Sequence, residues 1–124
     1  MSDVSIKRIE DIPFFTGPKA VPGIKFRSAG RELGVTAWGM NVIDIDPLVS
    51  KYPEHDHTKD GQEEVYVVLR GSATLKAAGQ TVQLTPGALV RVGPAEKRHF
   101  TAGPDGLTLL ALGATPGKAY EPRR

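Results

Sequence analysis

The stretch YPEHDHTKDGQEEVYVVLRG, residues 52–71, places two histidines one residue apart and follows them with two adjacent glutamates and a run of β-forming residues. The whole chain contains only three histidines. On an extended segment, residues two apart face the same side and lie about 6.6 Å apart, at roughly 3.3 Å per residue. His55 and His57 can therefore converge on a single ion, while Asp56 points the other way.

A carboxylate follows this pair at the start of the next expected strand, residues 64–69. If Glu64 faces inward, Tyr66 and Val68 face inward as well, and an antiparallel neighbour would bring Glu64 across from the histidines. Glu63 is adjacent and remains an alternative ligand. The third histidine, His99, follows a Pro-Gly turn, a strand and a second proline turn, where a later strand can return to the same interior.

The rest of the chain alternates short β-rich runs with turn signals. Its 14 glycines and 10 prolines favour short strands over long helices. No segment keeps an i, i+3, i+4, i+7 apolar pattern over eleven or more residues. A hairpin is expected about Gly79-Gln80. The expected strands are residues 35–45, 64–69, 72–78, 81–84, 89–92, 98–102 and 107–112, which is typical of an all-β sandwich or barrel.

The size and composition of the chain fit one soluble globular domain. It has 124 residues, of which 40% are apolar and 24% charged. We expect a single domain over residues 1–124, with an extended N-terminal arm at about residues 1–30 and a C-terminal tail at about residues 115–124. The prolines in both end segments favour this extended conformation.

Several functional classes are disfavoured by the composition. The chain has no cysteine, which excludes disulfides, thiolate zinc sites and cysteine nucleophiles. The start, MSDVSIKRIEDIPFF, lacks the apolar run of a signal peptide, and no stretch approaches the roughly 20 apolar residues of a membrane span. The net charge is +2, and the basic residues form no stripe interleaved with aromatics. We therefore expect a cytoplasmic protein that binds neither membranes nor nucleic acids.

The histidines and their neighbours resemble the two motifs of the cupin superfamily of small β-barrels. The first motif reads His-x-His, then Glu, six residues and Gly, and it is matched here by His55, His57, Glu64 and Gly71. The second motif runs from a glycine through Pro-x-Gly to a histidine. In many of its members the part after Pro-Gly is stretched to a short strand, a proline and four residues before the histidine. It is matched by Gly79, Pro86-Gly87, residues 89–92, Pro94 and His99. The resemblance covers roughly residues 43–112.

The chain departs from these motifs without losing a candidate ligand. The gap between His57 and the glutamate is six residues, longer than usual, and this is why Glu63 remains an alternative. The spacing to Gly71 favours Glu64. Three further substitutions replace motif residues: Ser50 for the first glycine, Glu96 for the glycine before the last histidine, and Ala102 for an asparagine.

The resemblance implies a cupin-type double-stranded β-helix, or jelly-roll, barrel with a metal held by His55, His57, Glu64 and His99. Three imidazoles and one carboxylate suit a divalent transition metal such as Fe, Mn, Ni, Cu, Co or Zn. The implied activity is that of a metal-dependent oxidoreductase, similar to a dioxygenase, acting on a small organic molecule. The alternatives are a barrel that binds or senses a small molecule without turnover, and a metal-dependent isomerase. The resemblance also implies a homodimer.

Two further residues are weaker candidates for a catalytic role. Tyr66 is expected to fill the barrel, with a catalytic phenol as the alternative. Arg91 is expected on a solvated face, with an inward position that binds an anionic ligand as the alternative. Aromatic residues elsewhere, Phe26, Trp38 and Phe100, are expected to pack in the core.

Overall fold

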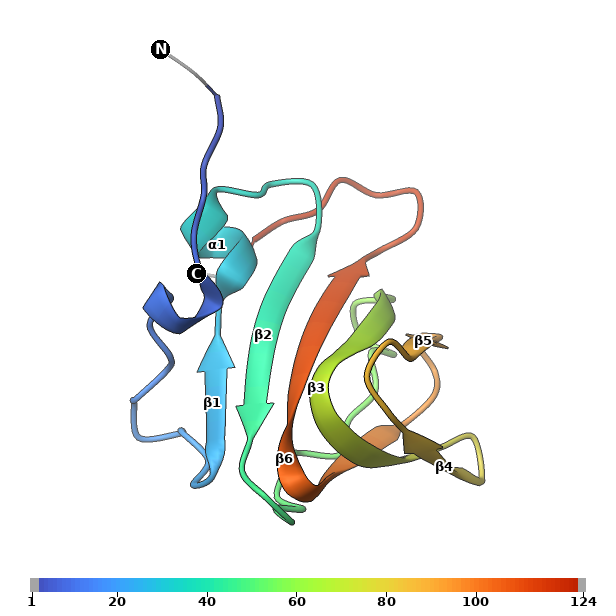
Figure 1. Cartoon of the computed structure of the whole chain (residues 1–124). Coiled ribbons are helices and arrows are strands. Elements are labelled where there is room, and N and C mark those ends of the chain that lie inside the picture. The colour runs from blue at the N-terminus through green and yellow to red at the C-terminus, as the bar shows by residue number, and fades with distance from the viewer. Residues whose placement is uncertain (1–2, 123–124) are drawn as a thin grey trace.

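Two long antiparallel strands, β3 (Glu63–Ala77) and β6 (Arg98–Ala114), run along the middle of the fold (Figure 1). The computed structural model describes residues 3–122, so the outermost residues of the expected arm and tail, 1–2 and 123–124, lie outside the described residues. Within this part of the chain, six strands form one sheet in the order β1-β2-β6-β3-β4, and β5 also pairs with β3. The other strands are β1 (Ile24–Arg27), β2 (Gly39–Ile45), β4 (Gln80–Leu84) and β5 (Leu89–Val92).

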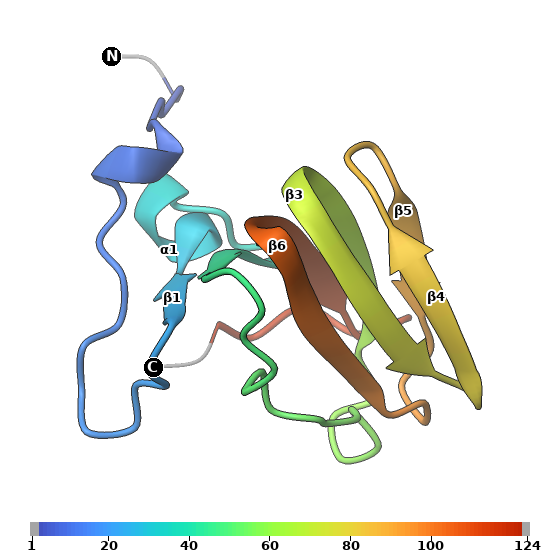
Figure 2. The same cartoon turned by 60° about the horizontal axis from the view of Figure 1, so that its bottom comes forward.

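Both long strands continue through positions where the sequence predicted breaks. The β3–β6 register shifts between Val68 and Arg70 and again between Gly71 and Ala73, which marks β-bulges. Gly71 has φ 74°, and a Cβ there would lie 1.9 Å from the carbonyl oxygen of Gly106. The strand therefore bends at this glycine instead of ending. Strands β4 and β5 pair with β3 and lie on its side away from β6 (Figure 2).

The inward side chains of the curled sheet form the main core. Strand alternation is kept on β3, where Tyr66 and Val68 are buried as predicted. They pack with residues from β2 and β6, including Ile43, Phe100 and Leu109. The predicted all-β architecture is confirmed, and so is the core position of Phe100.

A smaller cluster on the outer side of the sheet is covered by the N-terminal segment. It joins Ile12, Ala29 and Val42. The residues expected to form an extended arm thus include a 3₁₀ turn, η1 (Ile9–Asp11), strand β1 and the start of the short helix α1 (Ala29–Leu33). Gly34 ends α1 with φ 84°.

The local predictions differ from the structure mainly at element ends. The first long strand was expected at residues 35–45 and begins only at Gly39. The β3–β4 hairpin turns at Ala78 and Gly79, both with positive φ, one residue earlier than predicted. Strand β5 has the predicted bounds. Among residues 3–122, no helix is long and apolar enough to cross a membrane.

Candidate metal centre

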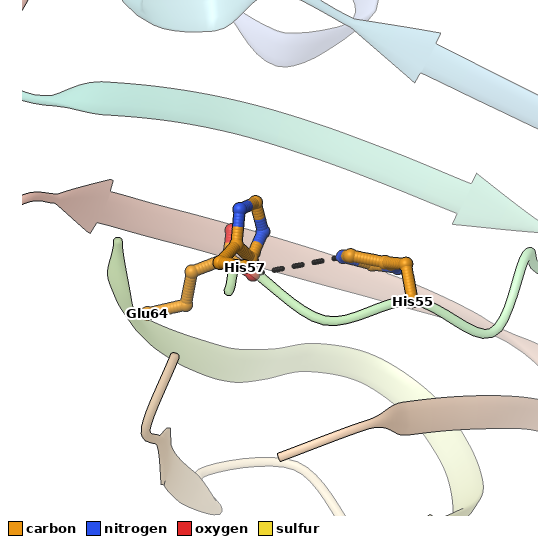
Figure 3. Close-up of side chains that lie close together, drawn as sticks. All are labelled: His55, His57 and Glu64. Carbon is orange, nitrogen blue, oxygen red and sulfur yellow. Dashed lines mark ion pairs between the residues drawn. The ribbon is translucent and has the colours of Figure 1, made fainter. Parts of the chain in front are cut away.

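His55 and His57 lie on the loop that leads from β2 to β3 (Figure 3). His55 exchanges two backbone hydrogen bonds with Arg98, at 3.3 and 3.0 Å, and the N–H of His57 donates to the carbonyl of Pro94 at 2.8 Å. These bonds tie the loop to the start of β6. The ring centroids are 5.1 Å apart at an interplanar angle of 84°. The two imidazoles lie close together, although the segment is not a regular strand.

Both imidazoles are oriented through Nδ1. In His57 this nitrogen lies 3.1 and 3.2 Å from the two carboxylate oxygens of Asp60, and in His55 it lies 3.0 Å from the carbonyl oxygen of Pro53. Carbonyl and carboxylate oxygens only accept, so these contacts assign the Nδ1 proton to each neutral ring. Nε2 then carries a lone pair, which is the state in which imidazole binds a metal.

Glu64 brings a carboxylate against both Nε2 atoms. Its Oε1 lies 3.0 Å from Nε2 of His57 and 3.8 Å from Nε2 of His55, an ion-pair distance longer than a hydrogen bond (Figure 3). Gly113, opposite Glu64 on β6, leaves room for it, because a Cβ there would lie 3.1 Å from Glu64 Cγ. The structure thus brings together three of the four predicted ligands.

The geometry of these three residues fits a metal ion. Nε2 of His57 is buried and has no hydrogen-bond partner within the described residues, because its contact with Glu64 lacks hydrogen-bond geometry. Two lone pairs at 3.0 Å repel each other unless a cation bridges them. Two atoms bound to one metal at about 2.1 Å and at right angles lie about 3.0 Å apart. The ligand atoms of His55, His57 and Glu64 all lie within 4.8 Å of one another, so this group could hold a metal.

Arg98 is the residue of the site that the sequence analysis missed. It is fully buried, and its Nη1 donates to Glu64 Oε1 at 2.6 Å. Nη2 donates to the carbonyls of Gly93 and Glu96 at 2.9 and 2.8 Å, and Nε donates to Glu96 at 3.1 Å. The Tyr66 hydroxyl donates to the same Glu64 oxygen at 2.6 Å. Glu64 is therefore held from two sides.

These contacts set the protonation of the site. Burial alone would raise the pKa of Glu64, but His55, Tyr66, His57 and Arg98 outweigh it and lower this pKa to about 2. Glu64 in turn raises the pKa of His55, against the lowering effect of burial. Burial raises the pKa of the Tyr66 phenol, so it stays protonated and donates its hydrogen bond to Glu64.

The structure does not bring His99 to this group. Arg98, Phe100 and Ala102 are the buried residues at the start of β6, so His99 lies on the opposite face of the strand. Its Nε2 lies 2.8 Å from the carbonyl oxygen of Ser50. Because a carbonyl only accepts, that nitrogen carries a proton and is not available as a ligand.

The structure also places the remaining candidate residues, Glu63, Arg91 and Tyr66. Glu63 and Arg91 form a partly exposed ion pair at 2.5 Å on the outer face of β3 and β5. Glu64, and not Glu63, thus belongs to the histidine group, and Arg91 does not point into the barrel. Tyr66 packs against Phe100 with ring centroids 4.8 Å apart, and its hydroxyl acts on Glu64.

A cavity of about 1090 Å³ opens beside the three residues. Its lining includes the amides of Asn41 and Gln62 and the aromatic rings of Phe26 and Trp38. Phe26 and Trp38 were expected in the core, but they are 39% and 46% exposed. Both residues line the cavity, a position that sequence alternation alone does not locate.

Comparison with known proteins gives the fold. No known family profile matches the sequence, and no curated protein is similar to it in sequence. A sugar phosphate isomerase of the cupin superfamily from Silicibacter pomeroyi is 19% identical over 90% of this chain and 77% of that chain, with TM-score 0.74. A predicted oxalate decarboxylase from Thermotoga maritima is 18% identical over 90% and 99%, with TM-score 0.71. The cupin domain of an XRE family transcriptional regulator from Enterobacter cloacae is 17% identical over 82% and 99%, with TM-score 0.63. These likenesses show that this chain has the cupin fold that the sequence predicted.

Proposed function

We propose that this chain is a metal-binding cupin that oxidises a small organic molecule in a dioxygenase-like reaction, with the metal held by His55, His57 and Glu64. One observation carries this proposal. Nε2 of His57 is buried without a hydrogen-bond partner in the described chain, and it faces a carboxylate oxygen at 3.0 Å. Asp60 meanwhile fixes the proton on the other ring nitrogen. This arrangement is the outer-shell support typical of a metal-ligating histidine.

The donor set favours particular metals. Two imidazoles and one carboxylate with open positions are the ligands that non-haem Fe(II) oxygenases use, so Fe is the first metal to test, before Mn, Ni, Co, Cu and Zn. When bound, a redox-active metal supplies electron exchange between a chelated substrate and dioxygen, whereas a redox-inert one supplies only Lewis acidity.

The chain's own residues would prepare the site for this chemistry. Glu64 offers a charge that needs no deprotonation at neutral pH, because its pKa is about 2. Phe26 and Trp38 give the cavity an apolar wall, and Asn41 and Gln62 provide amides that can hydrogen-bond to a polar substrate. A small enolate or diol with an apolar body fits such a lining.

The test begins with the metal content of untagged protein, measured by elemental analysis beside His57→Ala. Near one equivalent of iron, manganese, copper or nickel, lost in the variant, would support the site. Oxygen uptake by the Fe(II)-reconstituted protein with small enolates and diols would then support the oxidation.

Other outcomes would replace the proposal. One equivalent of zinc without oxygen uptake would favour an isomerase, the activity named for the Silicibacter protein. No metal in either protein, even after reconstitution, would leave a barrel that binds a small molecule, as in a regulator's sensing domain.

A further inference from the structure

Resting on the metal site proposed above, we infer that Arg98 occupies the position of a fourth ligand without binding the metal itself. The metal would then be held by three side chains, with Arg98 acting as a positioning residue for Glu64 and with His99 outside the site. The cupin motif in the sequence points to His99 as the closing ligand, and the structure places the neighbouring residue there.

The register of β6 fixes this exchange. His99 pairs with the exposed Lys76 of β3, whereas Phe100 pairs with the buried Leu75. Turning His99 inward would require a shift of one residue along the strand. That shift would move Phe100 and Ala102, both buried, to the surface. The packing of the core therefore holds His99 out of the barrel.

The guanidinium of Arg98 is also fixed in place. Its donors are used on Glu64, on the carbonyls of Gly93 and Glu96, and more weakly on the Tyr66 hydroxyl at 3.5 Å. Moving a fully buried cation with all of these partners would break its hydrogen bonds and its ion pair, so Arg98 stays in the site. It is not exposed to the cavity either, so it acts through Glu64 and not on a substrate.

Two consequences follow for the metal. Three protein ligands leave three positions of a six-coordinate ion for substrate and dioxygen, where four ligands would leave two. In addition, the charge of Arg98 offsets that of Glu64. Both effects predict weaker metal binding than a site with a fourth imidazole would give.

The experiment is a Co(II) titration of the full chain, followed by calorimetry and by the visible absorption of the bound ion, which reports its ligands. The wild type should bind about one Co(II), and His57→Ala should weaken binding by roughly 100-fold or more. His99→Ala should change the affinity by less than about twofold and leave the spectrum as it is. It is the matched control, since it removes the imidazole next to Arg98, the residue of β6 that pairs with His55.

Arg98→His should add a ligand and remove a positive charge, so Co(II) should bind roughly tenfold tighter or more, with a changed spectrum. Arg98→Gln removes the charge without adding an imidazole, and it should not give the spectrum of the histidine variant. A new spectrum confined to Arg98→His is a result that a merely structural role for Arg98 would not produce.

Failure of the metal site and failure of the three-ligand arrangement would give different results. Absence of Co(II) binding in the wild type would overturn the metal site itself. Binding that is lost in His57→Ala and equally lost in His99→Ala would leave the metal site standing and overturn the three-ligand arrangement. If the Arg98 variants do not fold, His99→Ala still decides, because His99 is only partly buried and its ring bonds to one backbone carbonyl.

Discussion

Glu64 is the residue on which the contacts of the site converge. Its Oε1 accepts hydrogen bonds from Tyr66 and Arg98 and faces both histidines. Burial alone would raise the pKa of this carboxylate, and here its partners lower that pKa to about 2, so the group stays ionised. The carboxylate is thus prepared as a ligand before any metal arrives, whereas a metal must displace the proton that Glu64 favours on His55.

The Tyr66 hydroxyl offers a direct test of this preparation. Tyr66→Phe removes one donor to Glu64 and keeps the ring that packs on Phe100. We expect a loss of about 1 kcal/mol in the free energy of unfolding. Co(II) affinity should fall by roughly tenfold, because the loss of an outer-shell partner of a ligand typically lowers metal affinity by such a factor. Chemical denaturation and calorimetry measure the two effects.

The matched control is Tyr120→Phe, since the Tyr120 hydroxyl lies beside Gly39, whereas the described hydroxyl donor to Glu64 is that of Tyr66. Equal Co(II) affinity in the wild type and Tyr66→Phe would mean that the hydroxyl does not position the carboxylate.

His55 gives the site its pH dependence. Without metal, Glu64 raises the pKa of His55 above its usual value of about 6.5, so the ring keeps its proton to a higher pH. A metal must displace that proton, and its affinity should therefore fall as the pH drops through the raised pKa. The fall should approach tenfold per pH unit from this group alone.

Co(II) titrations between pH 5.5 and 8.5 would measure this dependence. A constant affinity over that range would contradict a role for His55 as a ligand. Asp56→Asn serves as the control, because that carboxylate bonds to Thr58 and not to either histidine ring.

At the scale of elements, the fold depends on β3 and β6 bending together. The bend lies where Gly71 approaches the backbone of Gly106, both with positive φ. The bend lets one end of β3 carry Glu64 into the site while its other end forms the β4 hairpin. A single glycine thus links the architecture to the position of the carboxylate.

Gly71→Ala should therefore be far more costly than an ordinary glycine replacement. The new Cβ would combine an unfavourable φ with a 1.9 Å clash against the carbonyl oxygen of Gly106. We expect a loss of about 3 kcal/mol or more in the free energy of unfolding, measured by urea denaturation. Gly79→Ala is the matched control: its φ is 71°, but among residues 3–122 no atom beyond its two chain neighbours lies within 4 Å of the added Cβ. It should lose only about 1 kcal/mol, and equal losses would remove the contact with Gly106 as the cause.

The same strands show what the sequence could and could not predict. The inward position of Glu64 beside the histidines could be predicted, because the alternation that buries Tyr66 and Val68 is plain in the residue types. The same alternation over Arg98, Phe100 and Ala102 places His99 on the other face of β6, whereas the motif predicted it as a ligand. The continuity of β3 through Gly71 depends on its contact with Gly106, 35 positions later. Local turn signals carry no information about such a distant contact.

At the scale of the whole molecule, the N-terminal segment extends beyond the body of the fold (Figure 1). Val4 and Ile6 on it are 71% and 85% exposed. The homodimer implied by the cupin resemblance would let such apolar side chains pack against a second copy. We expect a light-scattering mass near twice the 13.3 kDa of one chain.

Ile6→Asp should shift this protein toward the monomer, while Lys7→Ser, on the same segment, should leave the mass unchanged. A monomeric wild type at the same concentration would remove the prediction.

Metal binding should stabilise the molecule as a whole, because its ligands come from parts of the chain that meet only in the folded state. His55 and His57 lie on a loop tied to β6, and Glu64 begins β3. An ion that binds only this arrangement adds about 2.7 kcal/mol to the free energy of unfolding at a hundredfold excess over its Kd. For a chain of this size we expect a rise in Tm on the order of 10 °C, reversed by a chelator. His57→Ala should show no such rise, whereas His99→Ala should keep it. A Tm that is the same with and without Fe(II), Mn(II), Co(II), Ni(II) and Zn(II) would mean that the three side chains lie together only as a consequence of folding and bind no metal.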